Sequence, residues 1–144
     1  MDNVKVIKPF IKWAGGKQQL LPALINSSPS KFNKYFEPFV GSGALFFSLQ
    51  PKKALLSDVN SELINCYQVV KKQPGELITI LKHHINTSEY FYKIRAMKTN
   101  ELNEIERASR LLFLNRTCFN GLYRENKQGH FNVPFGKYKN PDLV

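Results

Sequence analysis

The chain has 144 residues, of which 21 are lysine or arginine and 11 are aspartate or glutamate, so its formal charge at pH 7 is +10. This length suits one domain or part of a larger one. Hydrophobic residues make up 42% of the chain, which excludes a disordered basic tail and the fibrous classes. No apolar run approaches the roughly 20 residues of a transmembrane helix, and the first residues lack a signal-peptide core. We therefore expect a cytoplasmic protein without a membrane partner.

The first half of the chain alternates expected strands and helices. Residues 34–39 (KYFEPF) and 54–56 are predicted strands, and each is followed by turn residues and then by an apolar helical run, at 44–49 and from 61 to 70. Asn60 is a good N-cap for the second of these helices. The alternation predicts an α/β sheet with a ligand crevice at the carboxyl ends of its strands.

After Lys72 the pattern changes to successive helices, expected over 74–85, 87–97 and 101–114. From Cys118 to Phe135 the helical period disappears. Two short aromatic-rich runs flank residues 125–129, which predicts a β-hairpin with a loop of about four or five residues. Because two strands cannot form a self-standing doubly wound sheet, we expect this sequence to be the first part of a longer protein.

The two cysteines, Cys66 and Cys118, are far apart and show neither CxxC nor histidine-ligand spacing. We expect two buried thiols, with no disulfide framework and no metal site.

Positive charge is densest between residues 107 and 139, where seven basic residues stand against one acid. Six aromatic residues are interleaved with them: Phe113, Phe119, Tyr123, Phe131, Phe135 and Tyr138. This mixture favours a surface for a polyanion with flat groups that can stack. A solvated basic face above an aromatic core is the alternative that the pattern leaves open.

Gly41 and Gly43 lie between the first strand and its helix, where a ligand close to the backbone would leave no room for a Cβ. A dinucleotide fingerprint needs a third glycine where this chain has Phe46, which disfavours a nicotinamide-dependent oxidoreductase. Asp58 ends the second strand, where a carboxylate can bind both hydroxyls of a ribose; a turn or N-cap role is the alternative. Glu37 adds a second acid, which suits a ligand without phosphates.

Residues 10–17 (FIKWAGGK) are not a phosphate loop, because Ile11 and Gln18 stand where that motif needs glycine and serine or threonine. Trp13 instead offers a stacking face, and Lys17 a cation for a carboxylate. A core tryptophan beside a solvated lysine is the alternative. Together these features describe a ligand with a ribose, a stackable ring, a carboxylate and no phosphate, which S-adenosylmethionine fits.

Four separated motifs resemble the Dam family of DNA adenine-N6 methyltransferases: FIKWAGGK at 10–17, FEPFVGSG at 36–43, SDVN at 57–60 and LNRTCFNGLYRENKQGHFNVPFGKY at 114–138. They occur in the family's order. The resemblance implies a Rossmann-like, S-adenosylmethionine-dependent methyltransferase fold with an inserted helical target-recognition domain, acting on adenine in duplex DNA, typically within GATC. Residues 1–70 would then belong to the cofactor-binding domain, and residues 71–144 to the recognition domain, with the hairpin near 118–136.

The resemblance also implies site residues. Trp13, Lys17 and Asp58 match cofactor-contacting positions, and the wall and turn of the same pocket would be formed by Glu37, Phe39, Gly41 and Gly43. The residues expected to bind DNA are Lys12, Arg116, Phe119, Asn120, Leu122, Arg124, Pro134, Lys137 and Tyr138.

Among the DNA-binding residues, Phe119 matches an aromatic that wedges into the duplex, and Asn120 an asparagine that helps to hold the opened site. Base edges would be read by Leu122, Arg124 and Pro134, and Arg124 can donate two hydrogen bonds to guanine. Lys137 often corresponds to an arginine in relatives; a lysine keeps the charge but loses the fork, which favours a phosphate contact. We assign Arg95, Arg116 and Lys139 to phosphates or to the surface.

The family's chemistry rotates the target adenine out of the stack. An Asp-Pro-Pro-Tyr-type motif then holds the amino group for direct methyl transfer, with no covalent intermediate and no metal, so positioning supplies most of the catalysis. This chain contains no Pro-Pro pair, and the motif is expected after Val144. We therefore expect no catalytic residue in this chain and no methyl transfer by this chain alone.

Double-stranded DNA is the expected partner and a monomer the expected state. A functional pairing with a restriction endonuclease and a solitary role both stay open. A non-catalytic DNA-binding module with a vestigial cofactor pocket is the second class of function, and cofactor binding distinguishes it from the first.

Overall fold

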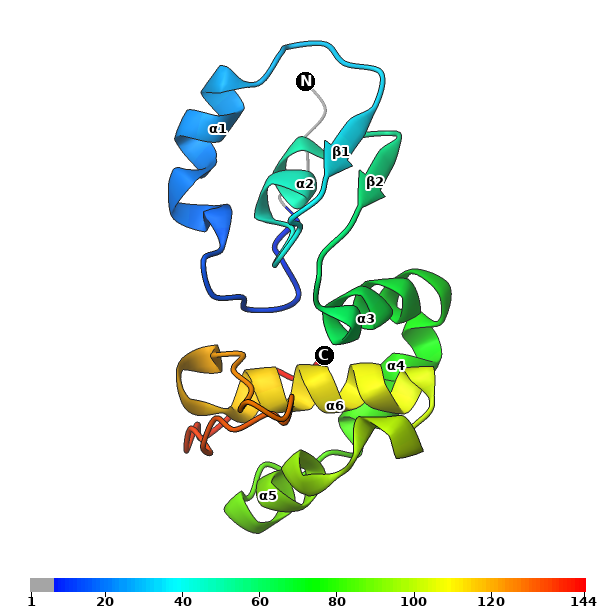
Figure 1. The fold of residues 1–144 in the computed structure, drawn as a ribbon, viewed down its shortest axis with the longest axis vertical. Helices are drawn as coiled ribbons and strands as arrows, with labels where there is room; N and C mark the ends of the chain where they lie inside the picture. Colours follow the sequence, from blue (N-terminus) through cyan, green and yellow to red (C-terminus); the bar gives the residue numbers. More distant parts are fainter. Residues whose placement is uncertain (1–6) are drawn as a thin grey trace. The chain divides into compact units, whose positions relative to one another are not determined.

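The structure is a computed structural model that describes residues 7–144. Its elements, traced in Figure 1, belong to two compact units, Met1–Val59 and Asn60–Val144, here called the N-terminal unit and the C-terminal unit. None of the helices within the described residues combines the length and the apolar character needed to cross a membrane.

The N-terminal unit holds a two-stranded parallel sheet. Its elements in chain order are η1 (Lys17–Leu20), α1 (Leu21–Ser27), β1 (Tyr35–Glu37), α2 (Ala44–Leu49) and β2 (Ala54–Leu56). The parallel pairing confirms the strand–helix–strand alternation. β1 is shorter than the expected 34–39 and ends before Pro38, which has no N–H to donate to a ladder.

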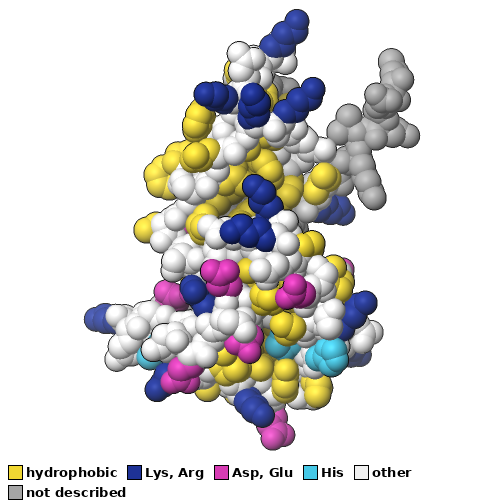
Figure 2. Space-filling view, turned by 90° about the vertical axis from the view of Figure 1, so that its right-hand side faces the viewer, with side chains coloured by type: hydrophobic (Ala, Val, Ile, Leu, Met, Phe, Trp, Pro, Cys, Tyr) yellow, Lys and Arg dark blue, Asp and Glu magenta, His cyan; other side chains and the backbone are white. Residues whose placement is uncertain are grey.

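The two faces of this sheet differ. On one face, the ring of Phe46 from α2 lies 6.3 Å from that of Tyr35 in β1. On the other, Phe36 and Leu55 are paired across the strands and are 64% and 59% exposed. Figure 2 shows hydrophobic side chains gathered on the surface of this unit.

The C-terminal unit is helical and is built around its longest helix, α6. Its elements are α3 (Ser61–Lys72), α4 (Pro74–Lys82), α5 (Ser88–Ala96), η2 (Thr99–Glu101), α6 (Glu104–Thr117) and η3 (Phe119–Gly121). α3, α4 and α5 all pack against α6 (Figure 1), which is buried along most of its second half. The succession of helices after Lys72 is therefore confirmed.

Capping side chains decide where these helices begin. Asn60 accepts a hydrogen bond from the Leu63 amide (2.9 Å), which confirms the expected N-cap of α3. α6 begins at Glu104 and not at residue 101, because Asn103 and Glu106 form a capping box that fixes the start of the helix. α4 stops at Lys82, earlier than the expected residue 85.

The expected hairpin is present as an antiparallel ribbon with isolated bridges, Cys118 to Phe135 and Glu125 to Phe131. Near its tip the Asn126 amide donates to the carbonyl of His130 (2.8 Å). This bond closes a loop of residues 127–129, shorter than the sequence indicated.

A partly buried polar cluster in the C-terminal unit surrounds His84. Its ring nitrogens lie 3.0 Å from the Tyr90 hydroxyl and 2.8 Å from Ser109 Oγ. The ring also stacks on Phe113, with the centroids 4.4 Å apart. Because both partners are neutral hydroxyl groups, nothing here compensates a positive charge on the imidazole, and burial lowers the pKa of His84 to about 4.

Both cysteines are free and buried, as expected. Burial raises the pKa of the Cys66 thiol to about 12, and the nearby carboxylate of Glu62 adds to the effect.

The lowered pKa of His84 makes the stability of the C-terminal unit depend on pH. The unfolded chain takes up a proton below the ordinary pKa of 6.5, whereas the folded protein resists it down to about 4. The free energy of unfolding should therefore be highest above pH 6.5 and fall as the pH drops towards 4. His84→Gln should reduce this fall by about 1 kcal/mol, after allowance for the solvent-exposed part of the ring.

Urea unfolding at pH 7.5 and pH 4.5 measures this dependence. His83→Gln is the matched control, because His83 is exposed. An equal loss of stability on acidification in wild type and His84→Gln would contradict the assignment.

Candidate functional site

In the turn between β1 and α2, the Trp13 ring lies close to the backbone of Gly41. Gly41 and Gly43 both have positive φ angles, 51° and 72°. A Cβ at Gly41 would lie 3.2 Å from Cδ1 of Trp13, tighter than ordinary van der Waals contact. A side chain at residue 41 would push the Trp13 ring away from the turn, and it would also be strained by the positive φ, so glycine suits both the contact and the backbone.

Asp58 ties the ends of the two strands together. Its Oδ2 accepts a hydrogen bond from the Gly41 amide (3.0 Å), directly after the Val40 amide donates to the Ser57 carbonyl (3.0 Å). Asp58 is not a helix N-cap, since Asn60 has that role. Trp13 and Asp58 are far apart in sequence, and in the structure both lie beside Gly41.

Lys17 and Glu37 form an ion pair beside this turn. The Nζ of Lys17 donates to Glu37 Oε1 (2.9 Å) and to the Phe39 carbonyl (2.7 Å). The Tyr35 hydroxyl donates to the other oxygen, Glu37 Oε2 (2.7 Å). Glu37 is only 5% exposed, and burial together with this carboxylate raises the pKa of Tyr35.

This part of the N-terminal unit therefore offers an indole ring, backbone without side chains at Gly41, and a fixed carboxylate. Phe39 adds a ring that is 74% exposed. Such a set suits a nucleoside-like ligand better than a metal ion, and no three acidic, histidine or cysteine side chains come together among residues 7–144. The cation of Lys17, expected to meet a carboxylate, is held by Glu37 in this structure.

A second set of expected residues lies on the surface of the C-terminal unit, in the turn after α6 and the ribbon that follows it. The amide of Phe119 donates to the carbonyl of Pro134 (2.9 Å), which brings these two residues together. Phe119 and Leu122 are 52% and 40% exposed, and Asn120 between them has a left-handed backbone, with φ at 55°.

Basic side chains of the same ribbon flank this turn. Arg124 is exposed, and its Nε donates to Asn132 Oδ1 (2.8 Å). Lys137 is exposed and has a left-handed backbone (φ 57°), and Tyr138 follows it. Arg116, in the last turn of α6, is half-buried.

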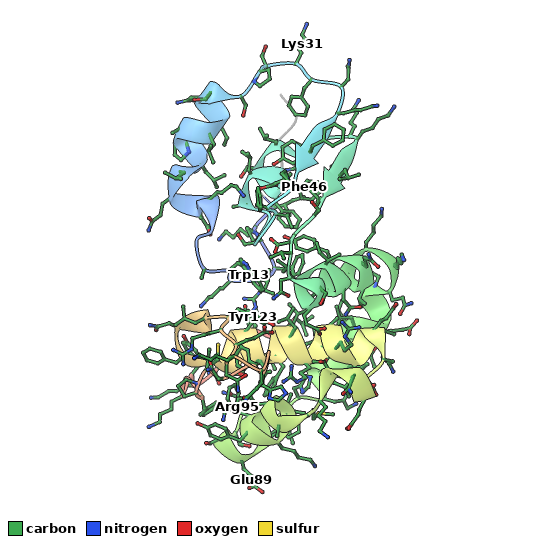
Figure 3. All side chains as sticks on the ribbon, viewed as in Figure 1. Trp13, Lys31, Phe46, Glu89, Arg95 and Tyr123 are labelled. Atoms are coloured by element: carbon green, nitrogen blue, oxygen red, sulfur yellow. The ribbon has the colours of Figure 1, made fainter. Side chains whose placement is uncertain are left out.

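Two other expected residues lie outside this turn and ribbon in sequence. Lys12 is exposed and belongs to the N-terminal unit. Arg95, assigned to phosphates or the surface, is half-buried; it donates from Nη1 to the Val133 carbonyl (3.1 Å), and its guanidinium lies 4.7 Å from the Tyr92 ring centroid. Figure 3 shows Arg95 on α5 among the side chains of the C-terminal unit.

The model of one protein family, the D12 class N6 adenine-specific DNA methyltransferases, matches residues 13–143. The chain belongs to this family. The match confirms the resemblance stated from the four motifs, and it covers both the turn at Gly41 and the ribbon after α6.

Individual relatives agree with the match. The type II methyltransferase M1.LlaDCHI of Lactococcus lactis subsp. cremoris is 49% identical over 144 residues, which cover 96% of this chain and 51% of the relative. The type II methyltransferase M.MjaIII of Methanocaldococcus jannaschii is 43% identical over 95% of this chain and 55% of its own. The DNA adenine methylase of Escherichia coli strain K12 is 38% identical over 96% and 51%. The chain spans about half the length of these curated relatives.

Sequence reasoning missed several residues that shape this D12-class chain. Tyr35 orients Glu37, Asn86 donates to the Tyr138 carbonyl (2.6 Å), and Asn115 donates from inside the core to the turn at 119–121. Asn115 directly follows the apolar run of residues 111–114, which is a sequence signal for a buried polar side chain; Tyr35 and Asn86 offer no comparable signal.

The backbone at Gly136 in the ribbon leaves no room for a Cβ. A Cβ there would lie 2.7 Å from the carbonyl oxygen of Cys118. Gly136→Ala should therefore lower the free energy of unfolding by about 1–3 kcal/mol, because the backbone has to move to admit a methyl group. Gly75→Ala is the matched control: it has no atom within 4 Å and should leave stability unchanged or raise it by up to about 1 kcal/mol. Urea denaturation of both variants checks the pair, and equal stabilities would contradict the assigned contact.

Proposed function

We propose that this chain is the cofactor-binding and DNA-recognising part of a site-specific DNA adenine-N6 methyltransferase. The observation that carries the proposal is the meeting of Trp13 and Asp58 at Gly41, in a chain that belongs to the D12 class. The finer fold in this proposal is a Rossmann-like methyltransferase domain, of which residues 1–70 form part, with an inserted recognition domain at 71–144 that contains the ribbon near 118–136. The enzyme would act in the cytoplasm, with the DNA.

S-adenosylmethionine is the proposed cofactor, and it supplies a methyl group activated by its sulfonium centre. The residues present fit it: Trp13 and Phe39 offer rings, and Asp58 offers a carboxylate for ribose hydroxyls. Gly41 and Gly43 keep side chains away from the ligand. Lys17 would meet the methionine carboxylate, with Glu37 holding the lysine in place.

Duplex DNA is the proposed partner of the C-terminal unit. Lys137 of its basic ribbon and Arg116 of α6 supply charge for phosphates, and Lys12 of the N-terminal unit would have the same role. Phe119 and Asn120 would occupy the space left when the target adenine rotates out of the stack. Leu122, Arg124 and Pro134 would read base edges, typically of GATC, and Tyr138 would contact the DNA beside them.

Residues 1–144 contain no Asp-Pro-Pro-Tyr-type motif, and we assign them no catalytic residue. Their proposed contribution to the reaction is positioning of donor and duplex. We propose a monomer. Relatives named type II methyltransferases support a functional pairing with a restriction endonuclease.

The cofactor part of the proposal depends on Asp58. Asp58→Ala removes the carboxylate that would bind the ribose and should weaken S-adenosylmethionine binding at least about tenfold. Isothermal titration calorimetry of the chain with S-adenosylmethionine measures this. Asp142→Ala, an equal change of charge at an exposed position, should leave the affinity unchanged. A chain that binds DNA but gives no heat with the cofactor would favour the non-catalytic module instead.

The DNA-binding part of the proposal predicts different effects on DNA affinity for substitutions of Arg124 and Lys139. Arg124→Ala should lower the preference for the cognate site by about 1–3 kcal/mol, because its Nη groups would donate to a guanine while Nε stays bonded to Asn132. Lys139→Ala should weaken binding to all duplexes similarly and flatten the salt dependence by about one unit of slope. Fluorescence anisotropy with GATC and scrambled duplexes at several salt concentrations separates these effects. An unchanged ratio of affinities in Arg124→Ala would exclude base reading by Arg124.

A further inference from the structure

The turn from Cys118 to Leu122 combines exposed apolar side chains with a left-handed backbone. Asn120 and Gly121 are consecutive residues with left-handed φ angles, 55° and 62°. On either side of them, Phe119 and Leu122 expose large apolar side chains. Asparagine followed by glycine takes two left-handed conformations in succession more readily than other pairs, so the local sequence allows this turn, while its position against the core depends on bonds from neighbouring residues.

Two side chains that are buried in the core hold this turn in position. Asn115 is 1% exposed, and its Nδ2 donates a hydrogen bond to the carbonyl of Gly121 (3.1 Å). The thiol of Cys118 adds a contact to the carbonyl of Leu122 at 3.2 Å. Two consecutive carbonyls of the turn are thus held by side chains that no DNA could touch.

An asparagine at position 115 has a free-energy cost. It is a weak helix former and needs partners when buried, while its neighbours on α6, Leu111, Leu112, Phe113 and Leu114, are apolar. An apolar residue at 115 would be compatible with the helix but would leave the Gly121 carbonyl without this donor. The bond from Asn115 to the turn is one physical reason for a polar side chain there.

We propose that Asn115 is a positioning residue that holds the 118–122 turn ready to enter an opened base pair. The inference rests on the proposed DNA-binding function and adds a residue that touches no nucleotide. With Asn115 in place, Phe119 and Leu122 are presented by a preformed turn. Without it, the turn must be ordered as the duplex opens, and that ordering lowers affinity only where opening is required.

The experiment compares Asn115→Ser with Thr117→Val. Thr117 is also fully buried in the last turns of α6, but its hydroxyl donates to the Phe113 carbonyl within the same helix (2.6 Å). Both variants remove a buried hydrogen bond, and only the first bond reaches the turn. Affinities are measured by anisotropy on the 144-residue chain, at a temperature where circular dichroism shows each variant folded.

Three duplexes are used: one with GATC, the same duplex with an abasic site opposite the target adenine, and a scrambled one. Asn115→Ser should bind the intact GATC duplex about tenfold more weakly than wild type. It should bind the abasic and scrambled duplexes within about twofold of wild type. Thr117→Val should match wild type on all three.

A loss of equal size on all three duplexes, or none on intact GATC DNA, would overturn the role of Asn115 while leaving the proposed function standing. A wild-type chain that does not distinguish GATC from scrambled DNA would instead overturn the proposed function, and the inference with it. If Asn115→Ser does not fold, Cys118→Ala acts on the same turn through the Leu122 carbonyl. It should then show the same pattern, and its absence counts against the proposal.

Discussion

The hydrogen bond from the Gly41 amide to the Asp58 carboxylate is the constraint on which the candidate cofactor site depends. It continues the pairing of β1 and β2 beyond the last ladder residue and so fixes where both strands end. That position in turn leaves the indole of Trp13 against a backbone with no side chain. The turn, the ends of the two strands and the aromatic contact with Trp13 therefore come together at Gly41.

The interior of the C-terminal unit contains polar side chains on its central helix, α6. α6 is buried along its second half, yet Ser109, Asn115 and Thr117 on it are polar. Each has a hydrogen-bond partner: His84, the Gly121 carbonyl and the Phe113 carbonyl. Buried polar groups stabilise a unique arrangement only when they are satisfied. Ser109 connects α6 to the segment between α4 and α5, Thr117 bonds within α6, and Asn115 connects the helix to the turn that follows it.

Much of this could be predicted from the sequence. The glycine turn, the parallel pairing around it and the Asn60 cap follow from local chemistry that single residues specify. The start of α6 was predicted too early because the capping box of Asn103 and Glu106 competes with a helical pattern that extends past it. The ion pair of Lys17 with Glu37 and the Arg95 bond to Val133 could not be predicted, because each joins residues that only tertiary folding brings together.

The burial of both cysteines has a practical consequence for spectroscopy. Cys66 and Cys118 are each 0% exposed, and the Cys66 thiol carries little of the thiolate that alkylating reagents need. A single cysteine introduced at Lys127, in the exposed loop at the tip of the ribbon, would react with such reagents much faster than the two buried thiols. A maleimide dye attached there would follow the ribbon without the native sulfur atoms having to be replaced.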